Sequence, residues 1–249
     1  MSGKWLKLRS IGTNDNRSMT KELSQLDKSL FDFGPLANKY DCWYGTSAGQ
    51  SHDRVQKQDV RCLLRPVKYY KQLLDVGCGT GHWSRFFSSL GYQIHGIDIS
   101  PEMIAVARTV VPECTFDVAD AYNLPFGDGA FDVVASMALL EFVSDPAAVV
   151  REIARCTKLG GSLLIGTLNR LAPLNQQRLS QGRQPYAAAH LLTAKELGEM
   201  LRPYGKVRMA ASPVGHREKL PPLAKMLPQW VRLSRGSLSG AFIVAEVQT

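Results

Sequence analysis

The sequence predicts an α/β fold in which the apolar strands of a mostly parallel sheet alternate with helices on both faces. The main observation is the stretch LLDVGCGTGHWSRFF at residues 73–87, where an apolar strand enters a glycine-rich turn and a helical pattern follows. A second apolar strand at 92–100 carries Asp98 near its end, 21 residues after Gly77. Further strand patterns recur at 131–135, 161–169, 207–211 and 241–247.

The glycine-rich turn places Gly77, Gly79 and Gly81 at alternate positions. Glycine tolerates unusual φ angles and lets backbone N–H groups approach a ligand, so a strand, such a turn and a helix N-terminus form an anion-friendly cradle. The dinucleotide fingerprint G-x-G-x-x-G would need glycine at the position of His82. An acid placed like Asp98 can accept hydrogen bonds from both hydroxyls of a ribose.

Helix boundaries follow from capping residues, prolines and glycines. Residues 52–64 are amphipathic and stop before Pro66. We expect a helix that begins after Asp145 to run as far as Gly160 and Gly161, because glycine commonly ends helices. The remaining predicted helix starts are Ser100, which precedes Pro101, and Thr193, which forms a capping box with Glu196.

The chain has 249 residues and a net charge of +8, which is spread unevenly. The net charge is +5 over residues 1–70, −5 over 71–168 and +8 over 169–249. Basic flanks fit an anionic substrate, nucleic acid or an acidic membrane surface, and equally a solvated surface without a partner.

Targeting signals and cysteine spacing indicate the compartment of the protein and whether it binds a metal. The five cysteines include no C-x-x-C pair, which favours reduced thiols in a cytoplasmic protein and argues against zinc or any other metal site. No signal-peptide h-region occurs, nor any run near the roughly 18 apolar residues of a membrane span. We expect residues 1–22 to be a flexible tail and residues 23–249 to form a single domain.

Three motifs appear in a fixed order: D-x-G-x-G-x-G from Asp75, G-I-D-x-S from Gly96 and D-A-x-x-L-P-F from Asp120. Together they resemble the class I S-adenosylmethionine-dependent methyltransferases, and most of all the small-molecule branch of ubiquinone and menaquinone biosynthesis. The resemblance is good over residues 31–166 and loose elsewhere. It implies a Rossmann-like seven-stranded sheet, mostly parallel with the last strand antiparallel, and S-adenosyl-L-methionine as cofactor.

The resemblance also implies a cofactor site, covered by an N-terminal lid at about residues 23–65. Its expected cofactor-binding residues are Tyr40, Tyr44, Asp75, Gly77, Cys78, Gly79, Gly81, Asp98, Ile99, Met103, Asp120, Ala121 and Met137. By this likeness Tyr40 reaches the methionyl carboxylate, while Asp75 holds the glycine turn and the cofactor's amino group. Aromatic faces attract a sulfonium cation and exclude water, although the same rings can serve only to pack against the core.

We expect two substrate-side insertions, at about residues 169–192 and 215–236. The first falls where the family inserts substrate-recognition segments. The second mixes apolar and basic residues, which fits a second lid or an apolar wall for the acceptor, and equally a surface helix with one buried face. Arg170, Arg178 and Arg183 favour some negative charge in the acceptor. Methyl transfer from a sulfonium is an in-line displacement, so the protein needs no obligatory catalytic side chain beyond a proton acceptor. The sequence offers three candidates for that role without selecting one: His190, Glu141 and Tyr186.

The predicted function is therefore methyl transfer from S-adenosylmethionine to a small apolar or anionic acceptor. An RNA or other nucleic-acid methyltransferase is the alternative that the basic flanks suggest. Residues 136–139 read SMAL, however, where base-amine methyltransferases carry an N-P-P-Y-like tetrad to hold a flipped base. A non-catalytic S-adenosylmethionine-binding protein is the third reading. The sequence leaves the acceptor, the methylated atom and the oligomeric state open.

Overall fold

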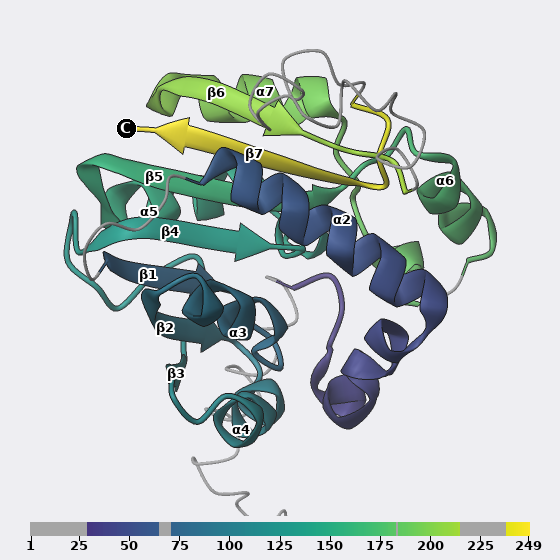
Figure 1. The fold of residues 1–249 in the computed structure, drawn as a ribbon, viewed down its shortest axis with the longest axis horizontal. Helices are drawn as coiled ribbons and strands as arrows, with labels where there is room; N and C mark the ends of the chain where they lie inside the picture. The colour runs from purple at the N-terminus through teal and green to yellow at the C-terminus, as the bar shows by residue number, and fades with distance from the viewer. Residues whose placement is uncertain (1–28, 65–70, 183, 215–237) are drawn as a thin grey trace, which may run out of the picture.

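A seven-stranded sheet forms the centre of the computed structural model, which describes residues 29–64, 71–182, 184–214 and 238–249 (Figure 1). Its strands are β1 (Lys71–Val76), β2 (Tyr92–Asp98), β3 (Thr115–Val118), β4 (Phe131–Met137), β5 (Thr157–Leu168), β6 (Lys206–Ala210) and β7 (Phe242–Gln248). They lie in the order β3-β2-β1-β4-β5-β7-β6. β1 to β5 pair in parallel, and β7 runs antiparallel to both β5 and β6. The predicted Rossmann-like sheet with its last strand reversed is confirmed.

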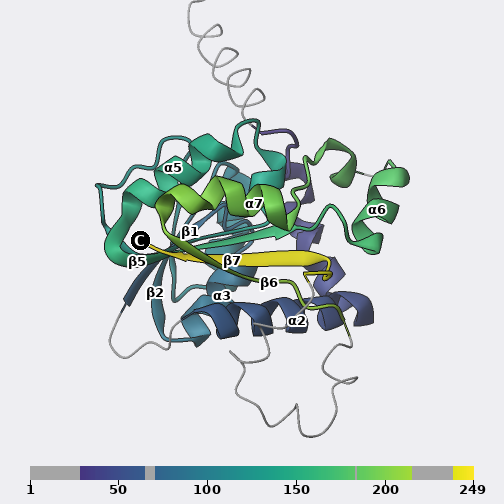
Figure 2. The same ribbon diagram turned by 90° about the horizontal axis from the view of Figure 1, so that it is seen from above.

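Helices cover both faces of the sheet (Figure 2). One face carries α2 (Ser47–Leu63) and α3 (His82–Ser89), and the other carries α5 (Pro146–Cys156) and α7 (Ala194–Leu201). The remaining helices are α4 (Pro101–Val110), which packs beside β3, α6 (Pro173–Ser180), and the 3-10 segments η1 (Gly34–Gly45), η2 (Leu140–Phe142), η3 (Tyr186–Ala188) and η4 (Arg202–Tyr204).

The central strands are buried on both sides, which explains why their sequences are almost continuously apolar. Neighbouring residues of β1 show the arrangement: Leu73 packs into the core beneath α2 and α3, and Leu74 into the core beneath α5 and α7. The same alternation places Val133 and Val134 of β4 in opposite cores. An apolar run in this chain therefore marks a strand between two helix layers.

The predicted starts of three helices, after Ser100, Asp145 and Thr193, are confirmed. The hydroxyl of Ser100 accepts a hydrogen bond from the Met103 N–H at 3.2 Å, and the Asp145 carboxylate accepts one from the Ala148 N–H at 3.0 Å. Thr193 accepts the Glu196 N–H, and the Glu196 carboxylate accepts the Thr193 N–H, which completes the capping box.

Two predicted boundaries are wrong. The helix expected at 52–64 begins at Ser47, because the Thr46 hydroxyl caps it by accepting the Gly49 N–H at 3.0 Å. Its first turn contains no large apolar residue, so the hydrophobic pattern did not reveal this start. The helix expected to run to Gly160 and Gly161 ends at Cys156, and both glycines lie inside β5. A Cβ on Gly161 would lie 2.8 Å from the carbonyl oxygen of Asp132, at the point where the register between β4 and β5 shifts.

The segment 169–192, expected to be a substrate-side insertion, contains α6 and η3. Asn175 of α6 is fully buried, and its side-chain amide donates hydrogen bonds to the carbonyls of Asn169 and Ala241 at 2.9 and 2.7 Å. The expected tail at 1–22 and the whole of the second insertion, 215–236, lie outside the described residues. None of the helices within the described ranges is long and apolar enough to cross a membrane.

We predict that Thr193→Ala lowers the free energy of unfolding by about 1 kcal/mol, because it removes the hydroxyl half of the capping box of α7. Urea unfolding measures the effect. The matched control is Thr109→Ala on α4, whose hydroxyl donates only to the Ala105 carbonyl, and we expect it to change stability by less than about 0.5 kcal/mol. Equal losses in the two variants would contradict the capping role.

Candidate active site

A pocket of about 560 Å³ lies at the carboxyl ends of β1, β2 and β4, beneath η1 and the residues before it; we call it the first pocket. Such crevices beyond the strand ends are where open α/β sheets bind ligands. The expected site residues on its wall are Tyr40, Tyr44, Gly77, Cys78, Gly79, Asp98, Ile99, Met103 and Met137. Four others do not line it: Asp75, Gly81, Asp120 and Ala121.

The glycine turn shapes the floor of the first pocket. Gly79 has a φ of +53°, and a Cβ on it would meet no atom within 4 Å. The backbone N–H groups of Gly77 and Cys78 both donate to the Ile97 carbonyl, that of Gly79 donates to Asp98, and that of Gly81 donates to the Cys78 carbonyl. These four amides are already used inside the protein. The amides of these three glycines and of Cys78 are therefore not free to cradle an anion, contrary to what the glycine-rich sequence suggests.

Asp98 links the end of β2 to the turn that follows β1. Its Oδ2 accepts the Gly79 N–H at 2.9 Å, and its Oδ1 accepts the Ser100 N–H at 2.9 Å. Burial raises the pKa of Asp98, and these hydrogen bonds oppose that rise. Because each carboxylate oxygen has a second lone pair, the fixed carboxylate on the pocket wall can still accept hydrogen bonds from a ligand hydroxyl.

Asp75 is fully buried beneath the turn and does not reach the first pocket. Its Oδ2 accepts the Ser84 hydroxyl at 2.6 Å, while its Oδ1 has no hydrogen-bond partner among the described residues. Burial raises the pKa of Asp75 to about 7. The contact that is present joins β1 to the first turn of α3, and is not the predicted contact with the glycine turn.

The lid segment η1 is fastened to the glycine turn at two points. The Thr80 hydroxyl donates to the Asp41 carboxylate at 2.9 Å. The Tyr44 ring stacks on the His82 ring, with centroids 3.7 Å apart and planes 7° apart, and Asp53 of α2 holds the other side of that imidazole at 2.7 Å. Sequence reasoning missed these pairs because their members are far apart in the chain and belong to no motif.

A second pocket of about 240 Å³ adjoins the first. The two share a wall of Phe33, Tyr40, Tyr44, Trp83, Ala138 and Phe142. Ala138, directly after β4, has a φ of +59° that only a few non-glycine residues adopt. Residues of the 169–192 segment, among them Arg178 and Tyr186, complete the second pocket. In Figure 1, α6 lies on the side toward which β4 points, as does the lid.

The two pockets differ in charge. The wall of the first contains Asp32, Asp98 and Glu102 and neither lysine nor arginine among the described residues. The wall of the second contains Lys39 and Arg178 and, within the same described ranges, no aspartate or glutamate. The first pocket therefore suits a cationic ligand and the second suits an anionic one.

The three candidate proton acceptors occupy different places. Glu141 is fully buried, lines neither pocket, and accepts hydrogen bonds from the Thr167 hydroxyl and the Leu168 N–H at 2.9 and 3.1 Å. Burial raises the pKa of Glu141 to about 7. His190 is exposed and also lines neither pocket. Of the three candidates, only Tyr186 lies on a pocket wall, so the described structure does not place Glu141 or His190 where a proton acceptor would meet a bound ligand.

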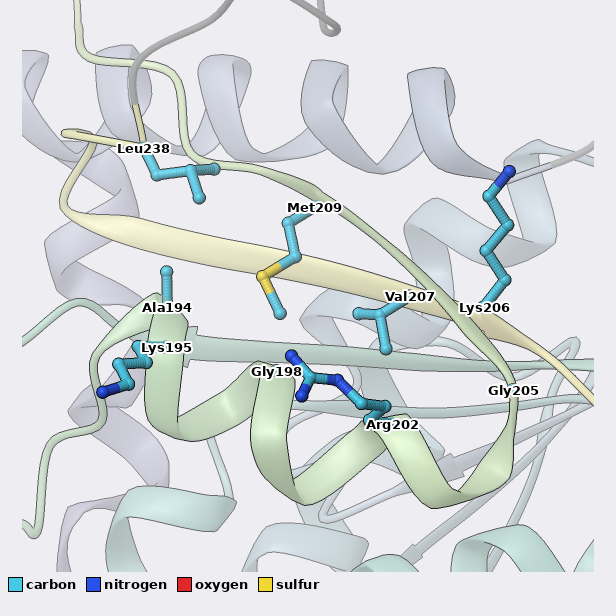
Figure 3. A pocket seen from close by; sticks show the side chains of 9 residues that line it. All are labelled: Ala194, Lys195, Gly198, Arg202, Gly205, Lys206, Val207, Met209 and Leu238. Carbon is cyan, nitrogen blue, oxygen red and sulfur yellow. The ribbon is translucent and has the colours of Figure 1, made fainter.

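Asp120 and Ala121 follow β3 at the same edge of the sheet but outside the first pocket as it stands. The Asp120 Oδ1 accepts the Tyr122 N–H at 2.9 Å, which closes a local turn. A third cavity, a groove between α7 and β6, shares no lining residue with either pocket (Figure 3).

We predict that Asp75→Asn stabilises the protein at neutral and alkaline pH. A carboxyl whose folded-state pKa is raised contributes stability below its ordinary pKa near 3.8, and that contribution is lost as the pH rises through about 7. The asparagine does not ionise, so we expect a gain on the order of 2–4 kcal/mol at about pH 8 and little gain near about pH 4. Urea unfolding at both pH values measures it.

The control for this prediction is Asp132→Asn. Against the opposing effect of burial, the Gln72 N–H and Lys158 hold the pKa of Asp132 below its ordinary value of 3.8. Relative to wild type, this variant therefore loses stability as the pH rises toward that value, and the loss stays constant at higher pH. A difference between Asp75→Asn and wild type that is the same at every pH would rule out a raised pKa at Asp75.

Comparison with known proteins places this geometry in a family. Residues 74–165 match the family described as "Methyltransferase domain". The chain is 36% identical over 156 residues to a ubiquinone biosynthesis O-methyltransferase of Xanthomonas axonopodis, a match that covers 59% of this chain and 62% of that protein. The chain thus spans less than two thirds of the length of that relative.

Two further matches cover more of the chain. An uncharacterized protein of Methanocaldococcus jannaschii is 31% identical over 175 residues, which are 70% of this chain and 80% of that one. The fold is similar to the crystal structure of an S-adenosylmethionine-dependent methyltransferase of Thermotoga maritima, with a TM-score of 0.65, 24% identity, and coverage of 87% of this chain and 97% of that one. The sheet order, the three motifs and these relatives agree: the chain belongs to the class I S-adenosylmethionine-dependent methyltransferases.

Proposed function

We propose that this protein transfers a methyl group from S-adenosylmethionine to a small-molecule acceptor, with the cofactor in the first pocket and the acceptor in the second. The observation that carries the proposal is that two pockets with walls of opposite charge adjoin each other and share six wall residues. A donor and an acceptor bound on either side of that junction lie close together, as a displacement reaction requires.

The first pocket fits the chemistry of the cofactor. S-adenosylmethionine carries a sulfonium and an ammonium group, and the wall carries the carboxylates of Asp32, Asp98 and Glu102. We assign Asp98 to the ribose hydroxyls, because its carboxylate is fixed by two backbone amides at the end of β2. Met103, the third residue of α4, is buried on the same wall, where it can contact the adenine.

The aromatic lid fits the need to keep water from the sulfonium. Tyr40 and Tyr44 lie on the wall shared by both pockets. Burial raises the pKa of both phenols, so they stay protonated at neutral pH and present neutral rings and hydroxyl donors to the junction. An aromatic face within about 6 Å of a cation attracts it.

The cofactor supplies an activated methyl group that leaves its sulfur by in-line displacement. What this chain contributes is position: effective alignment of donor and acceptor accounts for about 7–11 kcal/mol of barrier reduction in favourable cases. Of the three candidate proton acceptors, Tyr186 is the one placed on a wall of the acceptor pocket. An acceptor that is already ionised would need none.

A small acceptor is supported over nucleic acid by the size of the second pocket. At about 240 Å³ it is below the roughly 300–1,000 Å³ usual for ligand pockets, and aromatic rings enclose it. The name of the ubiquinone-biosynthesis relative, an O-methyltransferase, suggests a hydroxyl acceptor, which we adopt as the first class to test.

We predict that Asp98→Ala weakens the binding of S-adenosylhomocysteine by at least about tenfold, because it removes the acceptor for the ribose hydroxyls and frees the Gly79 amide. Calorimetry measures the affinity. The control is Asp117→Ala on β3, whose carboxylate pairs with His95 and Arg108 outside the first pocket, and we expect it to bind normally. An unchanged affinity in Asp98→Ala would contradict the ribose assignment.

A second experiment separates the acceptor classes. The protein is incubated with methyl-labelled S-adenosylmethionine and a cell extract, and we expect label to enter the small-molecule organic fraction. Label in RNA would instead support a nucleic-acid methyltransferase. Normal S-adenosylhomocysteine binding with no label in any fraction would support the non-catalytic reading.

A further inference from the structure

We infer that the methyl acceptor is a compact ring bearing an anionic group, a carboxylate or a phosphate, and that Arg178 recognises that group in the second pocket. This inference rests on the proposed function and specifies its acceptor. Its first observation is that no described carboxylate pairs with the guanidinium of Arg178.

Arg178 of α6 is half-buried, and among the described residues its guanidinium donates one hydrogen bond, to the Asn175 side-chain oxygen at 3.3 Å. Over the described residues, no carboxylate lies within ion-pair distance of it. Other arginines are paired: Arg155 with Asp128 at 2.8 Å, and Arg170 with Glu196 at 2.7 Å. A half-buried charge is costly without a partner, so a ligand anion is the natural complement.

The guanidinium is also held in place. Its carbon lies 4.6 Å from the centroid of the Tyr186 ring and 5.5 Å from that of the Trp43 ring. Asn175, its one hydrogen-bond partner, is fully buried and fixed through its amide N–H groups by two backbone carbonyls. A guanidinium stacked on rings keeps N–H donors at its edge, and these donors match both oxygens of a carboxylate or phosphate.

The rest of the second pocket supports the same ligand. Lys39 is its other cation, and its described wall has no acid. Apolar rings from four separate segments of the chain line it: Phe33, Trp83, Phe142 and Phe242. The small volume admits a single ring with substituents more readily than an extended chain.

A purely structural role for Arg178 is the competing explanation. In that case the guanidinium only connects the lid to η3, by contacting Trp43 of η1 and Tyr186 of η3. The charge of the acceptor would then not affect its binding. The two explanations differ in one measurable property, the preference of the second pocket for an anionic ring over a neutral ring of the same shape.

The test uses the full-length protein saturated with S-adenosylhomocysteine, titrated in a calorimeter with benzoate, phenyl phosphate and benzamide. We expect at least one of the two anions to bind about tenfold or more tighter than benzamide, and the better anion identifies the acceptor's group. Equal affinities for the three compounds, or no binding of either anion at millimolar concentration, would overturn the inference. This comparison needs no variant.

Variants then assign the preference to Arg178. We expect Arg178→Gln to bind benzoate and phenyl phosphate no better than benzamide, and Arg178→Lys to retain part of the preference. The matched control is Arg202→Gln, in the groove between α7 and β6 (Figure 3), which we expect to keep the whole preference. A preference that survives in Arg178→Gln with normal S-adenosylhomocysteine affinity overturns the assignment.

The two proposals fail separately. If wild-type protein does not bind S-adenosylhomocysteine, the proposed function fails before any ring compound is tested. If S-adenosylhomocysteine binds normally and the anions show no advantage, only the inference about the acceptor fails.

Discussion

The carboxylate of Asp98 is the contact on which the geometry of the first pocket depends. It accepts the Gly79 amide with one oxygen and the Ser100 amide with the other, and so joins the turn after β1 to the start of α4. Gly77 and Cys78 add two bonds to the carbonyl of Ile97, the residue before it. The turn is thus held to the end of β2 by three backbone amides, and of its three glycines with positive φ only Gly79 faces open space.

This use of the amides has a chemical consequence. A glycine turn at a helix N-terminus usually attracts phosphate through free N–H groups. Here the N–H groups of the turn glycines donate within the protein, and Asp32, Asp98 and Glu102 contribute carboxylates to the wall of the first pocket. The wall around this strand–turn–helix unit is therefore acidic and favours a cation, which fits the sulfonium and ammonium groups of the family's cofactor.

The division of charge between the pockets arises from the order of the chain. The acidic wall is built largely from the central segment, whose net charge is −5 over residues 71–168, and the basic wall takes Lys39 and Arg178 from the two flanks. The aromatic residues of η1 stand between them. Under the proposed function, the opposite charges of the two pockets favour the donor on one side of the shared wall and the acceptor on the other.

Much of this architecture is determined by local sequence. Short apolar runs bounded by glycine and other turn residues are typical of strands buried on both faces, so the strands and their order along the chain could be predicted from the sequence. Caps at Ser100, Asp145 and Thr193 act within three residues, and for that reason they were predictable. The glycine turn and Asp98 belong to short motifs, and their place on the pocket wall followed.

Only the tertiary structure decided the rest, because it depends on contacts between distant residues. Glu141 follows β4 as an acceptor-facing residue should, yet Thr167 and Leu168 of β5 draw its carboxylate into the core. Arg178 is one of several basic residues in its segment, and it becomes distinctive only when Trp43 and Tyr186 approach its guanidinium and no acid does within the described chain. Burial and pairing are properties of the folded neighbourhood, and no local pattern encodes them.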